Sequence, residues 1–215
     1  MKWKVTALIV SLGLLSGCGN SATETIYQHL EKAVELEEPF VSQQQSLQEA
    51  EEKEYQLYEK MIALGTEEME ELSNLSDQAL ESVSEREQLM ESEKESVEQS
   101  KEEFDQIQSA ISDLEREDLQ DLVNQLEEEM NARYSSYGEL YDHYIAAIEE
   151  DRKLFTIIKD EELTMDSLQE QIDQVNQQYD LVHEKKEVFN HHTQSYNKLK
   201  RSFYEEAELD VHYEE

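Results

Sequence analysis

Apolar side chains recur at spacings of three and four residues through most of the chain. The cleanest runs extend from Val97 to Leu114, from Tyr134 to Ile158 and from Leu168 to Ala207. This spacing places apolar side chains on one side of an α-helix. Its regular alternation is typical of helices that pack at shallow angles. The pattern therefore predicts an all-α protein built from long helices.

Three breaks divide the helical pattern. Gly65 and Thr66 match a helix C-cap followed by an N-cap. Ser112 or Asp113 is the expected N-cap of the next helix, and Thr164 that of the last. The predicted helices cover about 24–64, 67–112, 117–159 and 165–207.

The four predicted helices are nearly equal in length. Each has about 43 residues and would be about 65 Å long. Equal helices with tight connections favour an elongated, antiparallel up-and-down four-helix bundle with coiled-coil-like packing. A single long coiled-coil rod is the alternative. Pro39 lies inside the first segment and should kink or split that helix, because proline removes a donor and clashes with the preceding turn.

The start of the chain differs from the rest. Lys2 and Lys4 precede an apolar run, Val5 to Leu15, which is too short to cross a bilayer as a helix. The run ends in Leu15-Ser16-Gly17-Cys18, which resembles the lipobox of bacterial lipoproteins. That resemblance implies that diacylglycerol is attached to Cys18 and that the chain is cut before it. An uncleaved N-terminal anchor around a free thiol is the alternative.

These features predict four parts in the chain. They are a lipoprotein signal peptide at 1–17, a lipidated tether at 18–23, one helical bundle domain at 24–209 and a disordered acidic tail at 210–215. Two acyl chains suffice for stable anchoring. We therefore expect a protein held by its lipid on the extracytoplasmic face of the cell membrane.

Composition narrows the classes of function. The chain has 53 acidic and 18 basic residues and a formal net charge of −35, which argues against nucleic-acid binding. Glycine and proline are too scarce, at 5 and 1, for the loops from which most catalytic clefts are built. The single cysteine excludes an intramolecular disulfide framework. We expect a non-catalytic protein.

No nucleophile or phosphate-binding motif is present in the sequence. The pairs Glu139/His143 and His183/Glu187 have a helical spacing that could hold a metal, but glutamate is so abundant that such pairs arise by chance. We expect no specific metal and no cofactor beyond the lipid. Weak Ca²⁺ or Mg²⁺ counter-ions on the acidic faces are expected instead.

Four tyrosines follow the helical spacing in the third segment. Tyr134, Tyr137, Tyr141 and Tyr144 could form an aromatic platform for sugar rings. The spacing favours a second interpretation, in which they belong to the core and each phenol reaches a polar partner.

A polar stripe repeats every seven residues in the fourth segment. It comprises Asn176, His183, Asn190, Asn197 and Tyr204. One interpretation is a polar recognition groove. The favoured one is a buried or half-buried hydrogen-bond ladder that fixes helix register.

Charged residues raise two further expectations. Asp151 occupies a core-like position, and Arg133 or Lys200 is its expected partner, because an unpaired buried charge is costly. The acidic runs Glu49–Glu54, Glu67–Glu71 and Glu127–Glu129 are expected on solvated helix faces.

The whole layout resembles the YkyA-type family of cell-wall-binding lipoproteins from Gram-positive bacteria. The resemblance rests on the lipobox, on Met130 to Tyr137 continuing to Leu140, Tyr141 and Tyr144, and on Val188 to Lys200 with Phe203 and Tyr204. It implies an up-and-down helical bundle outside the cytoplasmic membrane, a wall-binding role and no catalytic residues. The strong acidity implies that divalent cations would have to bridge this chain to anionic wall polymers.

Three hypotheses of function remain open at this stage. In the first, the protein binds or spaces peptidoglycan or another wall polymer, or scaffolds other envelope proteins. In the second, it is an adaptor that presents a helical face to one membrane or secreted protein. In the third, it is an enzyme or carries a metal or ligand.

Overall fold

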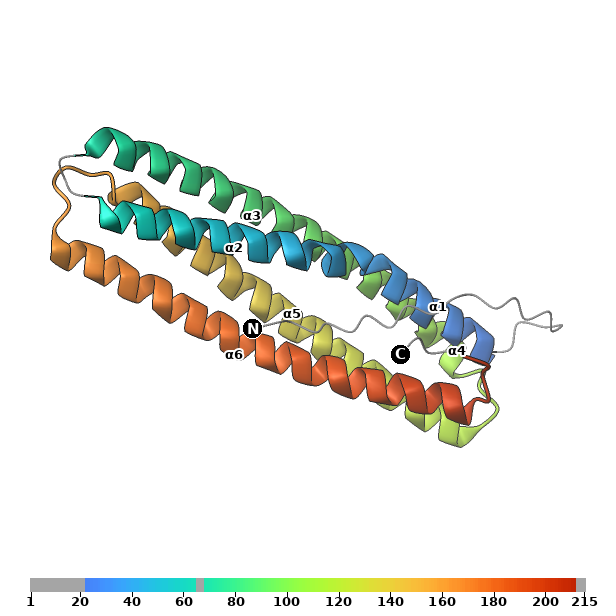
Figure 1. The fold of residues 1–215 in the computed structure, drawn as a ribbon. Coiled ribbons are helices and arrows are strands. Elements are labelled where there is room, and N and C mark those ends of the chain that lie inside the picture. The colour runs from blue at the N-terminus through green and yellow to red at the C-terminus, as the bar shows by residue number, and fades with distance from the viewer. Residues whose placement is uncertain (1–21, 65–67, 212–215) are drawn as a thin grey trace. The chain divides into compact units, whose positions relative to one another are not determined.

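The computed structural model describes residues 22–64 and 68–211 (Figure 1). Every regular element in these two ranges is helical, so the prediction of an all-α protein is confirmed. The elements are α1 (Ala22–Leu36), α2 (Glu38–Ala63), α3 (Met69–Phe104), the 3-10 turn η1 (Asp105–Ile107), α4 (Gln108–Ile111), α5 (Glu117–Ile157) and α6 (Met165–Glu206).

The contacts divide the chain into two compact units, where the sequence predicts one bundle domain over 24–209. Of the described residues, unit 1 comprises 22–41, 93–136 and 189–211, and unit 2 comprises 42–64, 68–92 and 137–188. Unit 1 contains α1, the end of α3 with η1 and α4, the first half of α5 and the second half of α6. Unit 2 contains most of α2, most of α3, the second half of α5 and the first half of α6.

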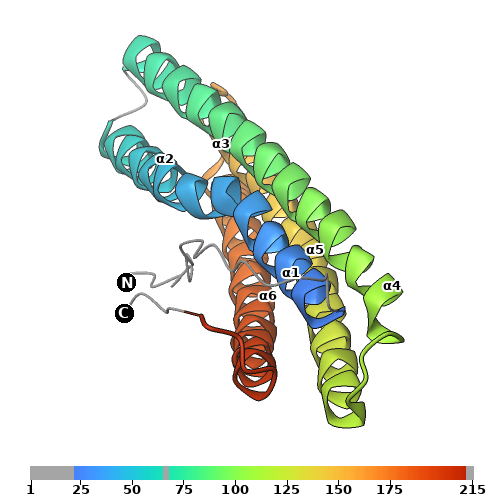
Figure 2. The same ribbon diagram turned by 90° about the vertical axis from the view of Figure 1, so that its right-hand side faces the viewer.

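In unit 1, neighbouring helices run in opposite directions. His29 of α1 pairs with Glu103, and Glu37, which follows α1, pairs with Ser100. The residue numbers rise along the first segment and fall along the second. Glu31 bonds Tyr204, and Phe40 packs edge-on against Phe189. Figure 2 allows α1 to be followed beside the ends of α3 and α6. This reversed pairing is that of an up-and-down bundle.

A cluster of aromatic rings forms much of the unit 1 core. Phe104 is completely buried, with its ring 6.1 Å from Tyr134 and 6.3 Å from Tyr196, both edge-on. Edge-to-face geometry is a favourable arrangement of ring quadrupoles. The predicted apolar runs therefore point inward in this unit.

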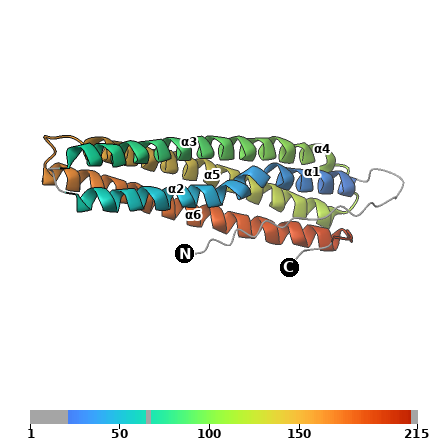
Figure 3. The ribbon, with the colours of Figure 1, turned by 45° about the horizontal axis from the view of Figure 1, so that its top comes forward.

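Unit 2 shows the same reversed pairing of helices. Gln43 and Glu54 of α2 contact Ser92 and Arg86 of α3. Glu150 and Glu139 of α5 bond Gln171 and Lys185 of α6. The ribbons of α5 and α6 can be followed in Figure 3. The core residues of this unit are Leu47, Leu57, Met61, Leu72, Leu75, Ala79, Val83, Met90, Ile148, Phe155 and Ile158.

Pro39 has the predicted effect on the first segment. The helix divides there into α1 and α2, and Glu37 lies between them. Pro39 is the second residue of α2, where a missing N–H leaves no helical hydrogen bond unmade. The division fixes the position of Glu37, whose carboxylate turns into the core of unit 1.

The other helix ends agree in part with the sequence. Thr164 caps α6, because its Oγ1 accepts a hydrogen bond from Ser167 N at 3.1 Å. Ser112 and Asp113 instead lie in the turn after α4, so the assignment of either as an N-cap is wrong, and α5 begins at Glu117. Helix α1 begins at Ala22, within the predicted tether. The predicted Gly65-Thr66 caps lie outside the described residues.

Candidate functional site

The second half of α6 differs in charge from the rest of the chain. No Asp or Glu occurs from Val188 to Tyr204, a stretch of 17 residues in a chain with 53 acidic residues among 215. At that average the stretch should contain about four. From Phe189 onward it belongs to unit 1. An acid-free helical segment on an acidic protein can approach anionic material that the other surfaces repel.

Buried aromatic residues fix which side of this segment meets solvent. Phe189, Tyr196 and Phe203 are seven residues apart and at most 3% exposed. The exposed side chains between Phe189 and Tyr204 are His191, Gln194, Asn197, Lys198 and Arg201. We call these five residues the α6 face. It offers amide donors and acceptors, an imidazole and two cations, which are groups that hydrogen-bond sugar hydroxyls and phosphates.

The other cation of this stretch, Lys200, is turned inward. It is 3% exposed, and its Nζ lies 3.0 Å from Glu31 Oε1, which also accepts a hydrogen bond from the Tyr204 hydroxyl. Burial raises the pKa of Tyr204 well above its ordinary value. This phenol therefore remains a neutral donor. The positive charge of the α6 face comes from Lys198 and Arg201.

A buried ion pair holds the junction of α1 and α2 in unit 1. Arg133 of α5 donates to both carboxylate oxygens of Glu37, at 2.7 and 2.6 Å, and its Nε donates to Thr193 at 3.1 Å. Ser100 donates to Glu37 Oε1 at 2.9 Å and also bonds the Tyr134 hydroxyl. The guanidinium carbon stacks 4.9 Å from the ring centre of Phe189. The network satisfies a charge that would otherwise be costly.

A second buried ion cluster lies in unit 2, around Arg86 of α3. Arg86 is fully buried and contacts Asp151 of α5 and Glu54 of α2, the latter at 3.0 Å. The predicted partners of Asp151 are therefore wrong: Arg133 and Lys200 belong to unit 1 and pair with Glu37 and Glu31. The prediction that Asp151 is buried and paired is correct.

Glu54 departs from the expected solvated acidic face. It is 4% exposed, whereas Glu49 and Glu52 in the same run are exposed. Burial raises the pKa of Glu54 to about 7, and Arg86 only partly opposes that effect. Burial disfavours the charged form of a carboxyl group, so this residue titrates near neutrality.

The tyrosine stripe is divided between core and half-buried positions. Tyr134 and Tyr137 are 7% and 3% exposed, while Tyr141 and Tyr144 are partly buried. Tyr144 donates to Glu51 at 2.5 Å. The four rings do not form an open platform, because the two most N-terminal are covered. Their burial agrees with the core interpretation.

The polar stripe of α6 is not a buried ladder. Asn176, His183 and Asn197 are exposed, Asn190 is half-buried and only Tyr204 is buried. Asn176 and His183 belong to unit 2, and the other three to unit 1. Asn197 is retained in the candidate site as part of the α6 face.

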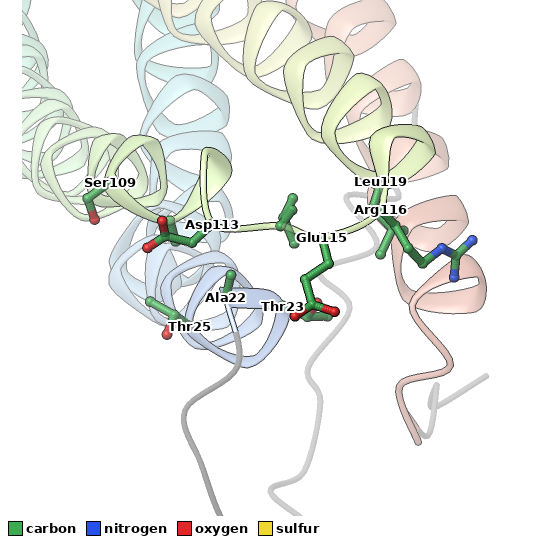
Figure 4. Close-up of a pocket in the computed structure, with 10 residues that line it drawn as sticks. Ala22, Thr23, Thr25, Ser109, Asp113, Glu115, Arg116 and Leu119 are labelled. Atoms are coloured by element: carbon green, nitrogen blue, oxygen red, sulfur yellow. The ribbon is translucent and has the colours of Figure 1, made fainter.

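A shallow hollow lies at the end of unit 1 (Figure 4). Its volume is about 560 Å³, and Ala22, Thr23, Ser109, Asp113, Glu115 and Arg116 are among its lining residues. Arg116 is held by Asp118 and by the carbonyl oxygen of Glu206. None of the residues predicted as functional lines the hollow, so it adds no chemistry to the α6 face.

The remaining predicted features concern metals and membrane attachment. Glu139 of the first candidate metal pair bonds Lys185 at 2.7 Å, and His183 and Glu187 of the second are exposed. Within residues 22–64 and 68–211, no cluster of three or more metal-binding side chains occurs. None of the helices described there has the length and apolar content needed to cross a bilayer. Cys18 lies outside the described residues.

Comparison with known proteins identifies the family. The family model YkyA, described as "Putative cell-wall binding lipoprotein", matches residues 21–206. The chain belongs to the YkyA family. "Uncharacterized lipoprotein YkyA" of Bacillus subtilis (strain 168) is 35% identical over 205 residues, which cover 95% of this chain and 92% of the relative. The resemblance to YkyA-type proteins is thus confirmed.

A solved structure supports the fold of this YkyA-family chain. A 1.6 Å crystal structure of a conserved protein of unknown function from Staphylococcus aureus matches with a TM-score of 0.59 at 15% identity. The match covers 87% of this chain and 98% of the other. At this identity the similarity concerns the fold alone.

Sequence reasoning missed the acid-free side of α6 and the buried members of the ion clusters. The first has a simple signal, the longest stretch without Asp or Glu after the leader. Glu37, Glu54 and Arg86 have no comparable signal, because each lies among residues that read as surface charge. The position of Asp151 within an apolar run, by contrast, indicated that its charge is buried.

Proposed function

We propose that this protein is a lipid-anchored, non-catalytic envelope lipoprotein that binds cell-wall material from the extracytoplasmic face of the membrane. The support is threefold: the description of its family, the lipoprotein name of its Bacillus relative and the leader that ends in Cys18. In this proposal the diacylglycerol on Cys18 is the membrane anchor, and unit 1 carries the wall-binding surface.

The single observation that carries the binding role is the absence of acidic residues on the α6 face. Wall polymers that carry phosphate or carboxylate groups are repelled by most of a chain with a net charge of −35. Lys198 and Arg201 can pair with such groups, while His191, Gln194 and Asn197 can bond sugar hydroxyls. Salt screens the repulsion from neighbouring acidic surfaces. Ca²⁺ or Mg²⁺ can bridge the carboxylates of these surfaces to anionic groups of the polymer.

Co-sedimentation with purified wall sacculi tests this proposal. The mature chain is mixed with sacculi that retain or lack teichoic acid, with and without Ca²⁺. We expect binding that is strengthened by Ca²⁺ when teichoic acid is present.

A pair of matched variants tests the role of the α6 face. Replacing Lys198 and Arg201 by Gln should abolish most of the binding to sacculi. Replacing Lys53 and Lys60, two exposed lysines of α2, removes the same charge and should leave binding intact. Equal loss in both variants would refute a role for the α6 face.

The anchor is tested separately in cells. Cys18→Ala should move the protein from the membrane fraction to the released fraction, and globomycin should trap an uncut precursor. A chain that is processed normally in the presence of globomycin would contradict lipoprotein maturation.

An adaptor function is the second candidate, and a specific observation favours it. Tyr55 and Ile62 of α2 are 58% and 48% exposed, and their spacing of seven residues places them on one face of the helix. A helical face of this kind can dock a protein partner. If the mature chain never co-sediments with sacculi and crosslinking in cells captures one envelope protein, the adaptor function replaces wall binding.

A further inference from the structure

The Arg86 cluster of unit 2 contains more buried negative charge than positive charge. The guanidinium of Arg86 is fully buried and faces two carboxyl groups that are themselves at least nine-tenths buried, Glu54 and Asp151. Removing charges from water is costly unless each is compensated. One cation cannot compensate two carboxylates, so the cluster is short of one positive charge.

The two carboxyl groups are not equally well satisfied. Oδ2 of Asp151 accepts hydrogen bonds from Arg86 Nη2 and from the Tyr179 hydroxyl, the latter at 2.7 Å. Oε2 of Glu54 lies 3.0 Å from Arg86 Nη2, but its Oε1 is buried without a hydrogen-bond partner among the described residues. Asp151 is therefore the better-stabilised anion, and Glu54 is the group on which a proton would reside.

Ser82 of α3 supplies a second unsatisfied atom. Its buried Oγ lacks a hydrogen-bond partner within the described part of unit 2. Its hydroxyl dipole lowers the pKa of Glu54, against the larger effect of burial, which raises it. The hydroxyl can donate to an ionised Glu54 or accept from a protonated one, so the excess of buried carboxylates over cations, and not Ser82, determines where the proton lies.

Charged and titratable groups from all four helices surround the cluster. They are Glu51 of α2, Arg86 of α3, Asp151 and Tyr144 of α5, and Tyr179 and Lys186 of α6. The Glu51 side chain is 41% exposed, and its Oε1 lies 3.8 Å from Arg86 Nη1. The charge of Glu51 also interacts favourably with that of Lys186. Of the described groups that act on Glu54, Arg86 alone is a cation. The neighbours therefore do not remove the deficit.

We propose that Glu54 carries a proton in the folded protein and releases it as the pH rises, so that unit 2 is a pH-responsive element. With the proton bound, α2 is held against α3 through neutral and charged hydrogen bonds. Once it is lost, two carboxylates share one guanidinium in the core and the attachment of α2 weakens. A protein on the outside of the membrane meets the external pH directly.

The direction of the effect follows from linkage. Burial raises the pKa of Glu54 to about 7 from an ordinary value of 4.5. Between these values the folded state holds a proton that the unfolded state has lost, so stability falls as the pH rises. The effect is complete above the folded pKa, where both states have lost the proton.

Denaturation of the mature chain between pH 5 and pH 8 tests the proposal. The wild type is compared with Glu54→Gln, which keeps a neutral donor at the site. The control is Glu52→Gln, which removes the same charge from an exposed position two residues away. The folding equilibrium constant of Glu54→Gln relative to wild type should rise by up to about tenfold per pH unit from pH 5 to 7 and then level off. The ratio for Glu52→Gln should stay nearly constant. A flat ratio for Glu54→Gln would overturn the proposal.

A second measurement needs no stable variant. Carbon-13 labelling of glutamate side chains allows the carboxyl resonances of the wild-type chain to be followed by NMR from pH 3 to 9. We expect one resonance to move with a midpoint near pH 7 while the surface glutamates titrate in the acidic range. Titration of every glutamate below about pH 5 would show that Glu54 is ionised at neutral pH and would refute the proposal.

Discussion

Arg133 donates one hydrogen bond to each carboxylate oxygen of Glu37, and Glu37 is the residue that separates α1 from α2. The bidentate geometry is specific to a planar guanidinium. It links the helix break at Pro39 to the centre of unit 1, where Ser100 and Tyr134 complete the network. The helix break and the buried charge therefore form a single structural feature.

Arg133→Met should be strongly destabilising. It leaves the Glu37 carboxylate buried without its cation, which costs about 3–5 kcal/mol in comparable pairs. Urea denaturation followed by circular dichroism measures this loss. Adding Glu37→Gln to the same chain should recover a large part of it, because the uncompensated charge is then removed. Additive losses in the double variant would contradict a direct coupling between the two residues.

Asp151→Asn should lower the melting temperature, because Arg86 loses a buried counter-ion. The loss should be smaller than the about 3–5 kcal/mol of a broken buried pair, since Glu54 also contacts Arg86. The negative charge of Asp151 raises the pKa of Glu54, so Glu54 should lose its proton at a lower pH in this variant. An unchanged melting temperature would mean that the Asp151 carboxylate is exposed in solution.

Gly138→Ala should stabilise the protein. Gly138 lies inside α5, and a methyl group added there meets no atom within 4 Å. Replacing an unconstrained helical glycine by alanine is worth about 0.5–1 kcal/mol. Gly138→Pro, which removes a helical hydrogen bond, should cost about 3 kcal/mol or more. A loss of stability in the alanine variant would indicate that this position requires glycine.

Salt should stabilise the folded chain. A net charge of −35 produces self-repulsion that sodium chloride screens. We expect the melting temperature to rise by several degrees from low to high NaCl, with sucrose of equal osmolarity as the uncharged control. A flat response to NaCl would exclude adaptation of the chain to a saline or alkaline exterior.

The helices could be predicted from sequence because their apolar periodicity is regular. Residues such as Phe104, Ile148 and Phe203 occupy the predicted seam positions and are fully buried. The cap at Thr164 and the break at Pro39 follow from local backbone chemistry, which depends on few residues. Ser112 failed as an N-cap because the turn that precedes α5 has neither Gly nor Pro to define its boundaries.

The prediction that the polar stripe of α6 is buried was wrong for a geometric reason. Asn176, Asn190 and Asn197 each follow a seam residue by one position. One residue corresponds to a rotation of about 100° on a helix, which is enough to turn a side chain from the core to solvent. A heptad repeat identifies a side of the helix, but the packing of its neighbours decides which side is buried.

The ion clusters could not be predicted because their members come from distant parts of the chain. Arg86 and Asp151 are 65 residues apart, and Glu37 and Arg133 are 96 residues apart. In a sequence with 53 acidic residues, nothing local distinguishes a buried glutamate from its exposed neighbours. Each pairing required knowledge of which helices are adjacent.

The acid-free stretch of α6 also gives unit 1 an electrostatic polarity. Exposed carboxylates on α1 and α5, such as Glu35 and Glu128, contrast with the side that carries Lys198 and Arg201. The electric field of this unit would orient an anionic polymer chain as it approaches, so that first contact occurs preferentially at the side with Lys198 and Arg201. Its rate of capture would then vary with ionic strength more steeply than its final affinity.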